Sequence, residues 1–331
     1  MMNYEIFKEV VKDKFMDYLP EQYRDMKLVV NPTPKVNCTL DGINLIGGKG
    51  ERLVSPTIYI NDMYEHYKHC EDLQSVLQSA AQAMEKAFDR NVEMPKIDAG
   101  EARDNIVFQL VNTEQNKEML ADMPHREYQD LSIIYRWIIK TDQEGIESTL
   151  IRNGLAEQLG FTEEQLFKLA AENTRRMFPP CVKSMNEVIR DMMMKDGMPQ
   201  EIAEMMMQEI PADKMMYVVS NDRGINGAIS MLYEDQLHRL SMNVGEDLYI
   251  LPSSIHEVIA VSVSMGTPEE LAEMVSEINM SQVSLDERLS NQVYHYDKDL
   301  RKLSLATDTP NKRLDGIVAE PPMVYEAKQS R

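Results

Sequence analysis

Residues 132–139 read SIIYRWII and residues 147–153 read ESTLIRN, with the turn-forming sequence TDQEG at 141–145 between them. Most of the first run is apolar: Ile133, Ile134, Tyr135, Trp137, Ile138 and Ile139. A near-continuous apolar run rich in β-branched and aromatic residues is typical of a buried strand. The sequence therefore predicts a β-hairpin here that centres a hydrophobic core.

The chain before this hairpin combines helices with short strands. Apolar residues recur at helical spacing over 3–18 and 71–90, which predicts two amphipathic helices. Short apolar runs at 28–30, 43–46 and 58–60 are separated by turn-rich segments and predict a small antiparallel sheet. A further strand is predicted at residues 106–111.

After the hairpin, a helix is predicted to start at Thr162, because Thr162 and Gln165 have capping-box spacing. Pro179 and Pro180 are predicted to end it. Residues 181–212 are rich in methionine and predict a pair of short helices broken at DGMP.

The C-terminal part predicts a β-β-α-β-β-α order. Its elements are strands 215–219 and 228–233, helix 234–244, strands 247–251 and 257–264, and helix 268–280. A last strand at 293–296 is predicted to pair with KLSLA at 302–306. This order favours an α+β fold in which helices cover antiparallel sheets.

We expect two lobes, because a chain of 331 residues exceeds the usual size of one hydrophobic core. The predicted division is an N-terminal α+β lobe at 1–180, a Met-rich helical connector at 181–212, a C-terminal α+β lobe at 213–305 and a tail at 306–331.

The composition limits what the protein can bind. Acidic residues outnumber basic ones by 55 to 35, and the resulting net charge of −20 repels nucleic-acid phosphate and anionic lipid. No apolar run approaches the roughly 20 residues of a membrane helix, and the N-terminus has no signal-peptide pattern. Cys38, Cys70 and Cys181 are widely spaced and odd in number, which indicates reduced thiols in a cytoplasmic protein.

Two short clusters invite a chemical interpretation. HYKHC at 66–70 brings two histidines and a cysteine together, but a tetrahedral zinc site needs a fourth ligand, and the alternative is a solvated helix start. LPSSIHEV at 251–258 contains Ser254 and His256, which suggests a hydrolase, although no G-x-S-x-G elbow is present. The alternative there is a turn that bonds its own backbone. The sequence predicts no metal site and no cofactor.

Three further groups are candidates for binding. His125 and Arg126 can present a cation to an anionic ligand, or they are ordinary surface groups. NDRGING at 221–227 is read as a hairpin turn whose Arg223 and Asn226 can donate at the mouth of a pocket.

Met193 and Met206 represent the methionine-rich segment, whose flexible side chains adapt to varied apolar partners. The alternative is a core-facing stripe, because Met185, Val188, Ile189, Met192 and Met193 follow helical spacing.

Several blocks together resemble the uncharacterised domain-of-unknown-function family 5688 of gut Gram-positive bacteria. They are LIRN with LGFTEEQLFKLAAENT, MYVVSNDRGINGAISMLY, DLYILPSSIHEVIAV and LSNQVYHYD, with MNYEIF, SPTIYIND and PHR nearer the N-terminus. A fainter likeness to uncharacterised family 1444 covers LGFTEEQL and the elements after it. The resemblance implies a bacterial cytosolic protein and brings no catalytic residue.

Three hypotheses follow. The preferred one is a non-enzymatic protein-binding or adaptor protein, and homodimerisation through an apolar helix or a strand edge is compatible with it. The second is a small-molecule hydrolase that uses Ser254 and His256 with help from Arg223. The third, based on the charge alone, is an acidic decoy of nucleic-acid-binding proteins.

Overall fold

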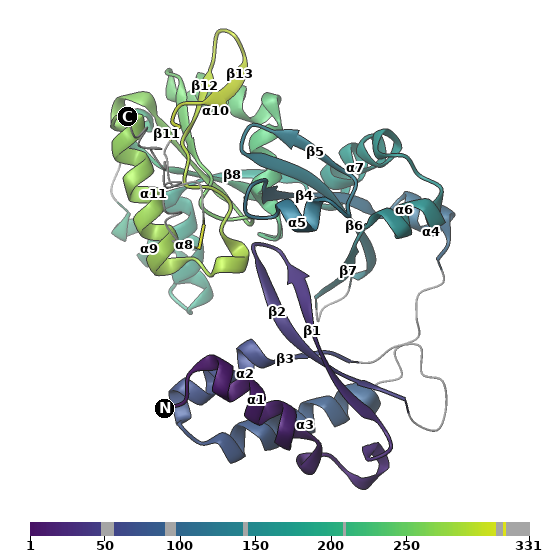
Figure 1. Cartoon of the computed structure of the whole chain (residues 1–331). Coiled ribbons are helices and arrows are strands. Elements are labelled where there is room, and N and C mark those ends of the chain that lie inside the picture. The colour runs from purple at the N-terminus through teal and green to yellow at the C-terminus, as the bar shows by residue number, and fades with distance from the viewer. Residues whose placement is uncertain (48–55, 90–96, 142–144, 208–209, 309–313, 316–331) are drawn as a thin grey trace, which may run out of the picture. The chain divides into compact units, whose positions relative to one another are not determined.

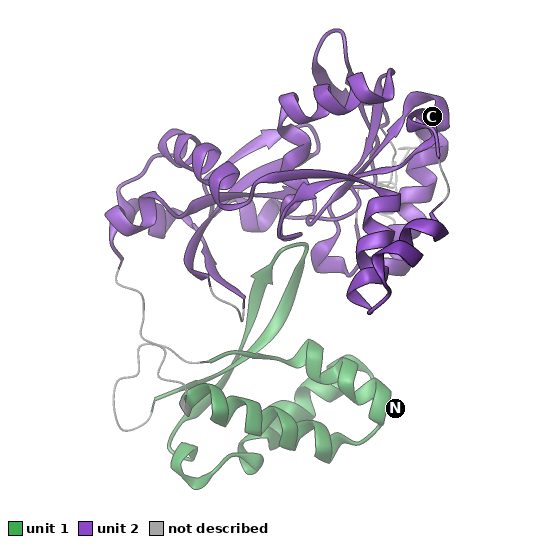
Figure 2. Cartoon of the chain, turned by 180° about the vertical axis from the view of Figure 1, so that it is seen from behind, with its two compact units in different colours: residues 1–96 green, residues 97–331 purple. Residues whose placement is uncertain are grey.

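The computed structural model describes residues 1–331 except 48–55, 90–96, 142–144, 208–209, 309–313 and 316–331. The chain divides into two compact units, residues 1–96 and 97–331 (Figure 1 and Figure 2). Both contain antiparallel strands together with helices, so the predicted α+β class is confirmed.

Unit 1 is a set of helices packed on a small antiparallel sheet. Its elements are α1 (Tyr4–Lys14), η1 (Phe15–Tyr18), η2 (Glu21–Tyr23), β1 (Lys27–Lys35), β2 (Cys38–Ile46), β3 (Ile58–Tyr59), α2 (Ile60–Cys70) and α3 (Leu73–Asp89). Asn3 caps α1 by accepting a hydrogen bond from the Ile6 amide at 2.9 Å. The predicted apolar stripe of the first helix is buried at Phe7, Val11 and Phe15.

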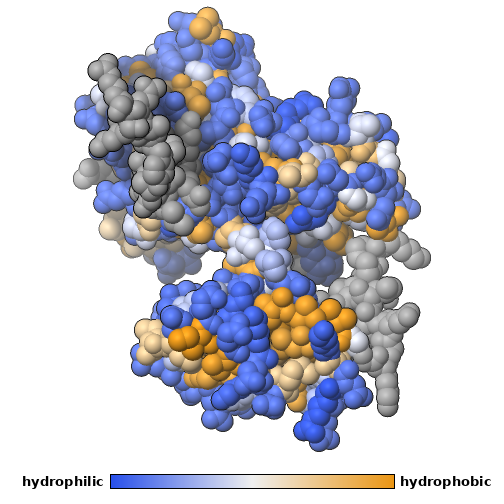
Figure 3. All heavy atoms as spheres, viewed as in Figure 1, coloured by the Kyte–Doolittle hydropathy of each residue, from blue (hydrophilic) through white to orange (hydrophobic). Residues whose placement is uncertain are grey.

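The predicted strands and second helix of unit 1 are also present. In the described part of the chain, β2 lies between β1 and β3 in antiparallel pairing. Hydrophobic side chains are exposed on this unit, Ile6 and Ile46 among them, and Figure 3 shows orange areas on the face of unit 1 turned to the viewer. Exposed and half-buried apolar groups are common on proteins and do not by themselves indicate a partner.

Unit 2 begins with a sheet built around the predicted hairpin. Its elements are α4 (Ala99–Arg103), β4 (Ile106–Asn112), α5 (Lys117–Leu120), β5 (His125–Tyr128), β6 (Leu131–Thr141), β7 (Ile146–Leu150), α6 (Asn153–Leu159) and α7 (Glu163–Met177). Strand β6 pairs with β4, β5 and β7, all antiparallel. The predicted hairpin is therefore confirmed as β6 and β7, although residues 142–144 of its turn lie outside the described residues.

The predicted start of α7 is confirmed in detail. Thr162 and Gln165 form a reciprocal capping box, and Leu166 and Ala170 are fully buried. The Thr174 hydroxyl accepts a hydrogen bond from the Phe108 amide at 2.9 Å, which ties α7 to β4.

A second sheet fills the rest of unit 2. Its region contains β8 (Pro180–Ser184), α8 (Met185–Lys195), α9 (Gln200–Met206), η3 (Ala212–Lys214), β9 (Tyr217–Asn221), η4 (Gly227–Leu232), α10 (Glu234–Val244), β10 (Leu248–Leu251), β11 (Val258–Ser262), η5 (Val263–Met265), α11 (Pro268–Gln282), η6 (Leu285–Glu287), β12 (Tyr294–Asp297) and β13 (Lys302–Leu305). Among the described strands the order is β13-β12-β10-β11-β9-β8. The predicted pairing of the last two strands is confirmed by Tyr294 opposite Leu305.

The two faces of this sheet pack against different layers. Val219, Ile250 and Tyr294 belong to the main core, which also contains β4, β6 and α7. Side chains alternate along each strand, so the neighbouring residues face the other side. There, Leu251 and Val261 pack against α11, and Val218 faces α8.

The predicted strand at 228–233 is wrong, because this segment forms the 3-10 helix η4. Strand β9 already pairs with β8 on one side and β11 on the other, so no edge is free for another strand. Asn226 adopts a left-handed conformation with φ of 51°, which turns the chain before η4. A Cβ on Gly227 would lie 2.2 Å from the Ser220 hydroxyl, so the close approach requires glycine.

Strand β8 was missed because Pro179 and Pro180 were interpreted only as the end of α7. Pro180 is the first residue of β8, and β8 is the last strand in the described order of its sheet. Proline is compatible with both places, since an edge strand has one side without ladder hydrogen bonds.

The compact units divide at residues 96 and 97, whereas the predicted lobes met at residues 181–212. The main core explains the difference, because it joins residues from Ala102 to Tyr296 across the predicted junction. The tail was predicted at 306–331, and residues 309–313 and 316–331 lie outside the described residues. Within the remainder, Leu314 is buried and its carbonyl accepts a hydrogen bond from Arg288 at 2.5 Å.

Candidate functional site

A cavity of about 390 Å³ lies between α8 and the end of the sheet formed by β8 and β9. Lys183 is paired with Val218 across the two strands, and Cys181 is paired with Ser220. All four side chains line the cavity because they share one face of the sheet. The opposite wall comes from one side of α8.

Charged side chains surround an apolar part of this cavity. Val188 and Met192 of α8 and Val218 of β9 supply the apolar surface. Lys183 forms an ion pair with Asp191 at 2.6 Å. Their hydrogen bond lowers the pKa of the Asp191 carboxyl and raises the pKa of the Lys183 ammonium, so both stay charged near neutral pH.

The start of the loop after β9, from Asn221 to Gly224, forms the remaining wall together with Glu257, and the loop is held by its own hydrogen bonds. The Asn221 side chain donates to the Ile225 carbonyl at 2.8 Å and accepts from the Arg223 amide at 3.0 Å. Arg223 lines the cavity, and its guanidinium lies 6.0 Å from the centre of the Phe178 ring. The prediction that Arg223 can lie at a pocket is consistent with this position, while Asn226 is not among the lining residues.

His256 is held on both ring nitrogens. Its Nδ1 accepts a hydrogen bond from the Asn226 amide at 3.2 Å, and its Nε2 lies 3.3 Å from a carboxylate oxygen of Glu287. The Ser254 hydroxyl accepts a hydrogen bond from the His256 backbone amide at 3.0 Å. These contacts fit a turn that bonds its own backbone and give Ser254 no base among the described contacts.

His125 and Arg126 lie on β5, and both are engaged by neighbours. Nδ1 of His125 lies 2.9 Å from the Met123 carbonyl oxygen. Arg126 donates to both carboxylate oxygens of Glu163 at 3.2 and 2.9 Å, and its guanidinium lies 3.8 Å from the centre of the Phe167 ring. A bidentate pair of this kind uses the donors that an anionic ligand would need.

The methionine-rich helices α8 and α9 are partly exposed. No residue of α8 is fully buried, and in α9 the only fully buried described residue is Ala203. Met206 is 57% exposed and Met205 78% exposed, while Met193 is half-buried. The sequence left open whether this stripe faces a core or a partner, and in the structure Met185, Val188 and Met193 of the stripe are half-buried while Ile189 and Met192 are exposed.

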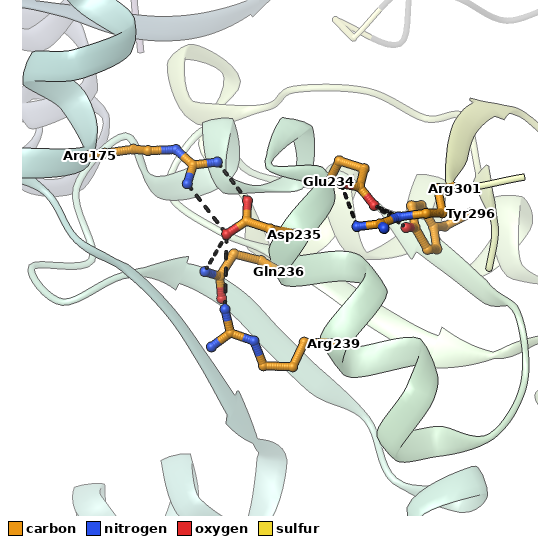
Figure 4. Close-up of polar contacts among 7 residues, drawn as sticks. All are labelled: Arg175, Glu234, Asp235, Gln236, Arg239, Tyr296 and Arg301. Carbon is orange, nitrogen blue, oxygen red and sulfur yellow. Dashed lines mark hydrogen bonds and ion pairs between the residues drawn. The ribbon is translucent and has the colours of Figure 1, made fainter. Parts of the chain in front are cut away.

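Charged side chains also surround the N-terminal end of α10 (Figure 4). Arg175 donates to the two carboxylate oxygens of Asp235 at 2.6 and 3.4 Å. Glu234 accepts hydrogen bonds from Arg301 and from the Tyr296 hydroxyl. Carboxylates near a helix N-terminus are favoured by the helix dipole, so this network stabilises α10 and its neighbours.

The HYKHC cluster is part of a helix. HYKHC lies in the last turns of α2 rather than at a helix start, and Nδ1 of His69 lies 2.8 Å from the Glu65 carbonyl oxygen. In the described part of the chain, no group of three or more His, Cys, Asp or Glu side chains is arranged to hold a metal ion. No described helix combines the length and the hydrophobicity that crossing a membrane requires.

Comparison with known protein families gives one match that covers most of the chain. The model of a family of unknown function, DUF5688, matches residues 4–298. The chain belongs to this family. The match spans both compact units, and it includes α8, β8, β9 and the cavity between them. No curated protein and no solved structure gives a significant match to this member of DUF5688.

Sequence reasoning missed most of the cavity. Cys181 was considered only as a reduced thiol, and Lys183, Asp191, Lys195 and Glu257 were not considered as lining groups. The spacing of Cys181 and Lys183 would have placed both on one face of a strand, had β8 been predicted. The three cysteines are free thiols in the structure, as expected.

Proposed function

We propose that this chain is a non-enzymatic protein-binding protein and that it binds its partner through the exposed Met-rich surface of α8 and α9. The observation that carries the proposal is that α8, a capped helix with a regular apolar stripe, has no fully buried residue. Its side chains Ile189, Met192 and Met194 are exposed and available to a partner, and exposed apolar groups gathered on one element are typical of interaction surfaces.

The exposed side chains on these helices are large and flexible. Met192 is 60% exposed and Ile202 45% exposed, in addition to Met205 and Met206. Methionine has three rotatable bonds and a polarisable sulfur, so a methionine surface adapts to partner side chains of different shape. This property suits an adaptor better than it suits an active site that must hold a substrate rigidly.

The surrounding charges indicate the partner's chemistry. Asp196, Glu201 and Glu204 are exposed on or between the two helices, and the whole chain carries a net charge of −20. An amphipathic helix with an apolar face bordered by lysine or arginine would satisfy both the methionines and the carboxylates. We therefore expect a basic amphipathic segment of another protein, met in the cytoplasm, where free thiols stay reduced.

The test uses a synthetic helical peptide with leucine on one face and lysine along its borders, labelled for fluorescence anisotropy. The double variant Met192→Gln/Met206→Gln is expected to bind it at least about tenfold more weakly, because both side chains lose apolar contact. Met242→Gln is the matched control, since Met242 on α10 is 63% exposed and lies outside this surface.

An equal loss of binding in the Met242→Gln protein would contradict the proposal, and so would undiminished binding by the double variant. A second peptide with glutamate in place of lysine separates the two parts of the argument. If that peptide binds equally well and still depends on Met192 and Met206, the surface is correct and the expected charge of the partner is wrong.

A further inference from the structure

The cavity between α8 and the strands β8 and β9 has properties that the protein-binding proposal does not use. Its volume of about 390 Å³ falls within the range of pockets that take small molecules, which is about 300–1,000 Å³. The lining combines an apolar surface with charges of both signs. Some of these charges already have an ion-pair partner within the protein.

One cation and one anion of the lining neutralise each other. Lys183 and Asp191 form an ion pair at 2.6 Å, and each therefore has a partner without any ligand. Two cations and two carboxylates are left in the lining: Lys195, Arg223, Asp222 and Glu257. Within the described residues, none of these four forms an ion pair, and all four are exposed.

A ligand that complements these four unpaired side chains must carry both a positive and a negative charge. A simple anion would satisfy the two cations but would be repelled by the two carboxylates, and a simple cation would meet the opposite problem. A molecule that carries an ammonium and a carboxylate at once satisfies both sets. Val188, Met192 and Val218 add an apolar surface for a hydrophobic side chain.

We propose that the cavity binds a small zwitterion, namely an amino acid or dipeptide with an apolar side chain. The carboxylate of the ligand contacts Arg223 and Lys195, and its ammonium contacts Asp222 and Glu257. The ion pair of Lys183 and Asp191 lies in the same lining, and the hydrogen-bonded loop around Asn221 holds the backbone of Arg223 in place before the ligand arrives.

The chain contains its own reporter for this test. Cys181 lines the cavity, whereas Cys38 and Cys70 lie in unit 1. The full-length protein is treated with iodoacetamide, and peptide mass spectrometry gives the alkylation rate of each cysteine separately. The probe is the dipeptide Leu-Leu, and its counterpart without charges is N-acetyl-Leu-Leu-amide.

Leu-Leu at about ten times its Kd is expected to slow alkylation of Cys181 about tenfold, because only the unoccupied fraction reacts. The rates at Cys38 and Cys70 stay unchanged, and the uncharged peptide gives no protection. Equal protection by the uncharged peptide, protection of all three cysteines alike, or no protection by Leu-Leu would each overturn the proposal.

Two arginine variants test the assigned contact. Arg223→Gln is expected to raise the Leu-Leu concentration needed for half-protection about tenfold, since it removes one partner of the carboxylate. Arg239→Gln is the matched control, because Arg239 is an exposed arginine of α10 that does not line the cavity. A Leu-Leu affinity that is unchanged by Arg223→Gln, or lowered equally by both substitutions, would overturn the role of Arg223.

Discussion

Helices α7 and α8 begin in the same way and are covered very differently. Each starts with a reciprocal capping box, Thr162 with Gln165 in α7 and Ser184 with Glu187 in α8. Each continues with an apolar stripe at helical spacing. In α7, Leu166, Ala170, Asn173 and Thr174 are buried, whereas α8 has no buried residue.

Caps and periodicity therefore determine that a helix forms, but not which elements cover it. Helix α7 packs against β4, and the Thr174 hydroxyl joins it to the backbone of that strand. Helix α8 faces β8 and β9, at the end of the strand order. A helix at such a place has fewer neighbours on its outer side, so an apolar stripe there stays partly open.

Truncating one apolar side chain in each helix should show the greatest contrast in stability between α7 and α8. Leu166→Ala is expected to lower the free energy of unfolding of unit 2 by about 2–5 kcal/mol, because it leaves a cavity beneath a fully buried side chain. Met192→Ala is expected to change it by less than about 0.5 kcal/mol, since Met192 is 60% exposed. Urea titration followed by the fluorescence of Trp137 measures both.

Trp137 suits this experiment because it is buried in unit 2 and is the only tryptophan of the chain. Comparable destabilisation by the two substitutions would show that α8 is covered in solution. That outcome would remove the observation on which the protein-binding proposal depends.

Much of the fold was predictable because local signals were strong where tertiary packing agreed with them. The hairpin of β6 and β7, the start of α7 and the pairing of β12 with β13 were all predicted from the sequence. In each case the apolar pattern and the turn or cap residues specify the same local structure, and such consistency makes a local prediction reliable.

The errors arose where long-range packing decided the local structure. Residues 228–233 have the composition of a strand, but β9 has β8 and β11 on its two sides, and the segment forms η4 instead. The cavity was not predictable for a related reason. Its lining joins side chains from β8, α8 and β9, and their proximity depends on the pairing of two strands, one of which was missed.

Removing the N-cap of each helix should have a smaller effect on stability, and the effect should differ between α7 and α8. Thr162→Ala and Ser184→Ala each remove an N-cap hydrogen bond worth about 1 kcal/mol. In α7 the loss should appear in the global stability, because unfolding this helix opens the core. In α8 it should appear as about fivefold faster local hydrogen exchange, with global stability unchanged.

Hydrogen exchange with mass spectrometry, combined with urea titration, distinguishes these outcomes. If Ser184→Ala lowers global stability as much as Thr162→Ala does, α8 is as strongly coupled to the core as α7, and the inferred difference between the two helices is wrong. Local exchange confined to α7 in the Thr162→Ala protein would likewise show that α7 opens independently of the core.

The two caps differ chemically, because residue N3 is Gln165 in α7 and Glu187 in α8. This difference should give only the start of α8 a small dependence on pH. Hydrogen bonds from the Ser184 amide and hydroxyl hold the pKa of Glu187 below its usual value. A carboxyl whose pKa is lowered by folding stabilises the helix above its unfolded pKa, and this contribution is lost as the pH falls through its folded pKa. Acidification from about pH 6 to about pH 3 should therefore reduce the hydrogen-exchange protection factors of the first turn of α8, after correction for intrinsic rates.

Glu187→Gln should remove that pH dependence while keeping the cap, since glutamine accepts the same hydrogen bonds without titrating. If the Gln variant loses protection with acid as the parent does, some group other than the Glu187 carboxyl controls the start of α8.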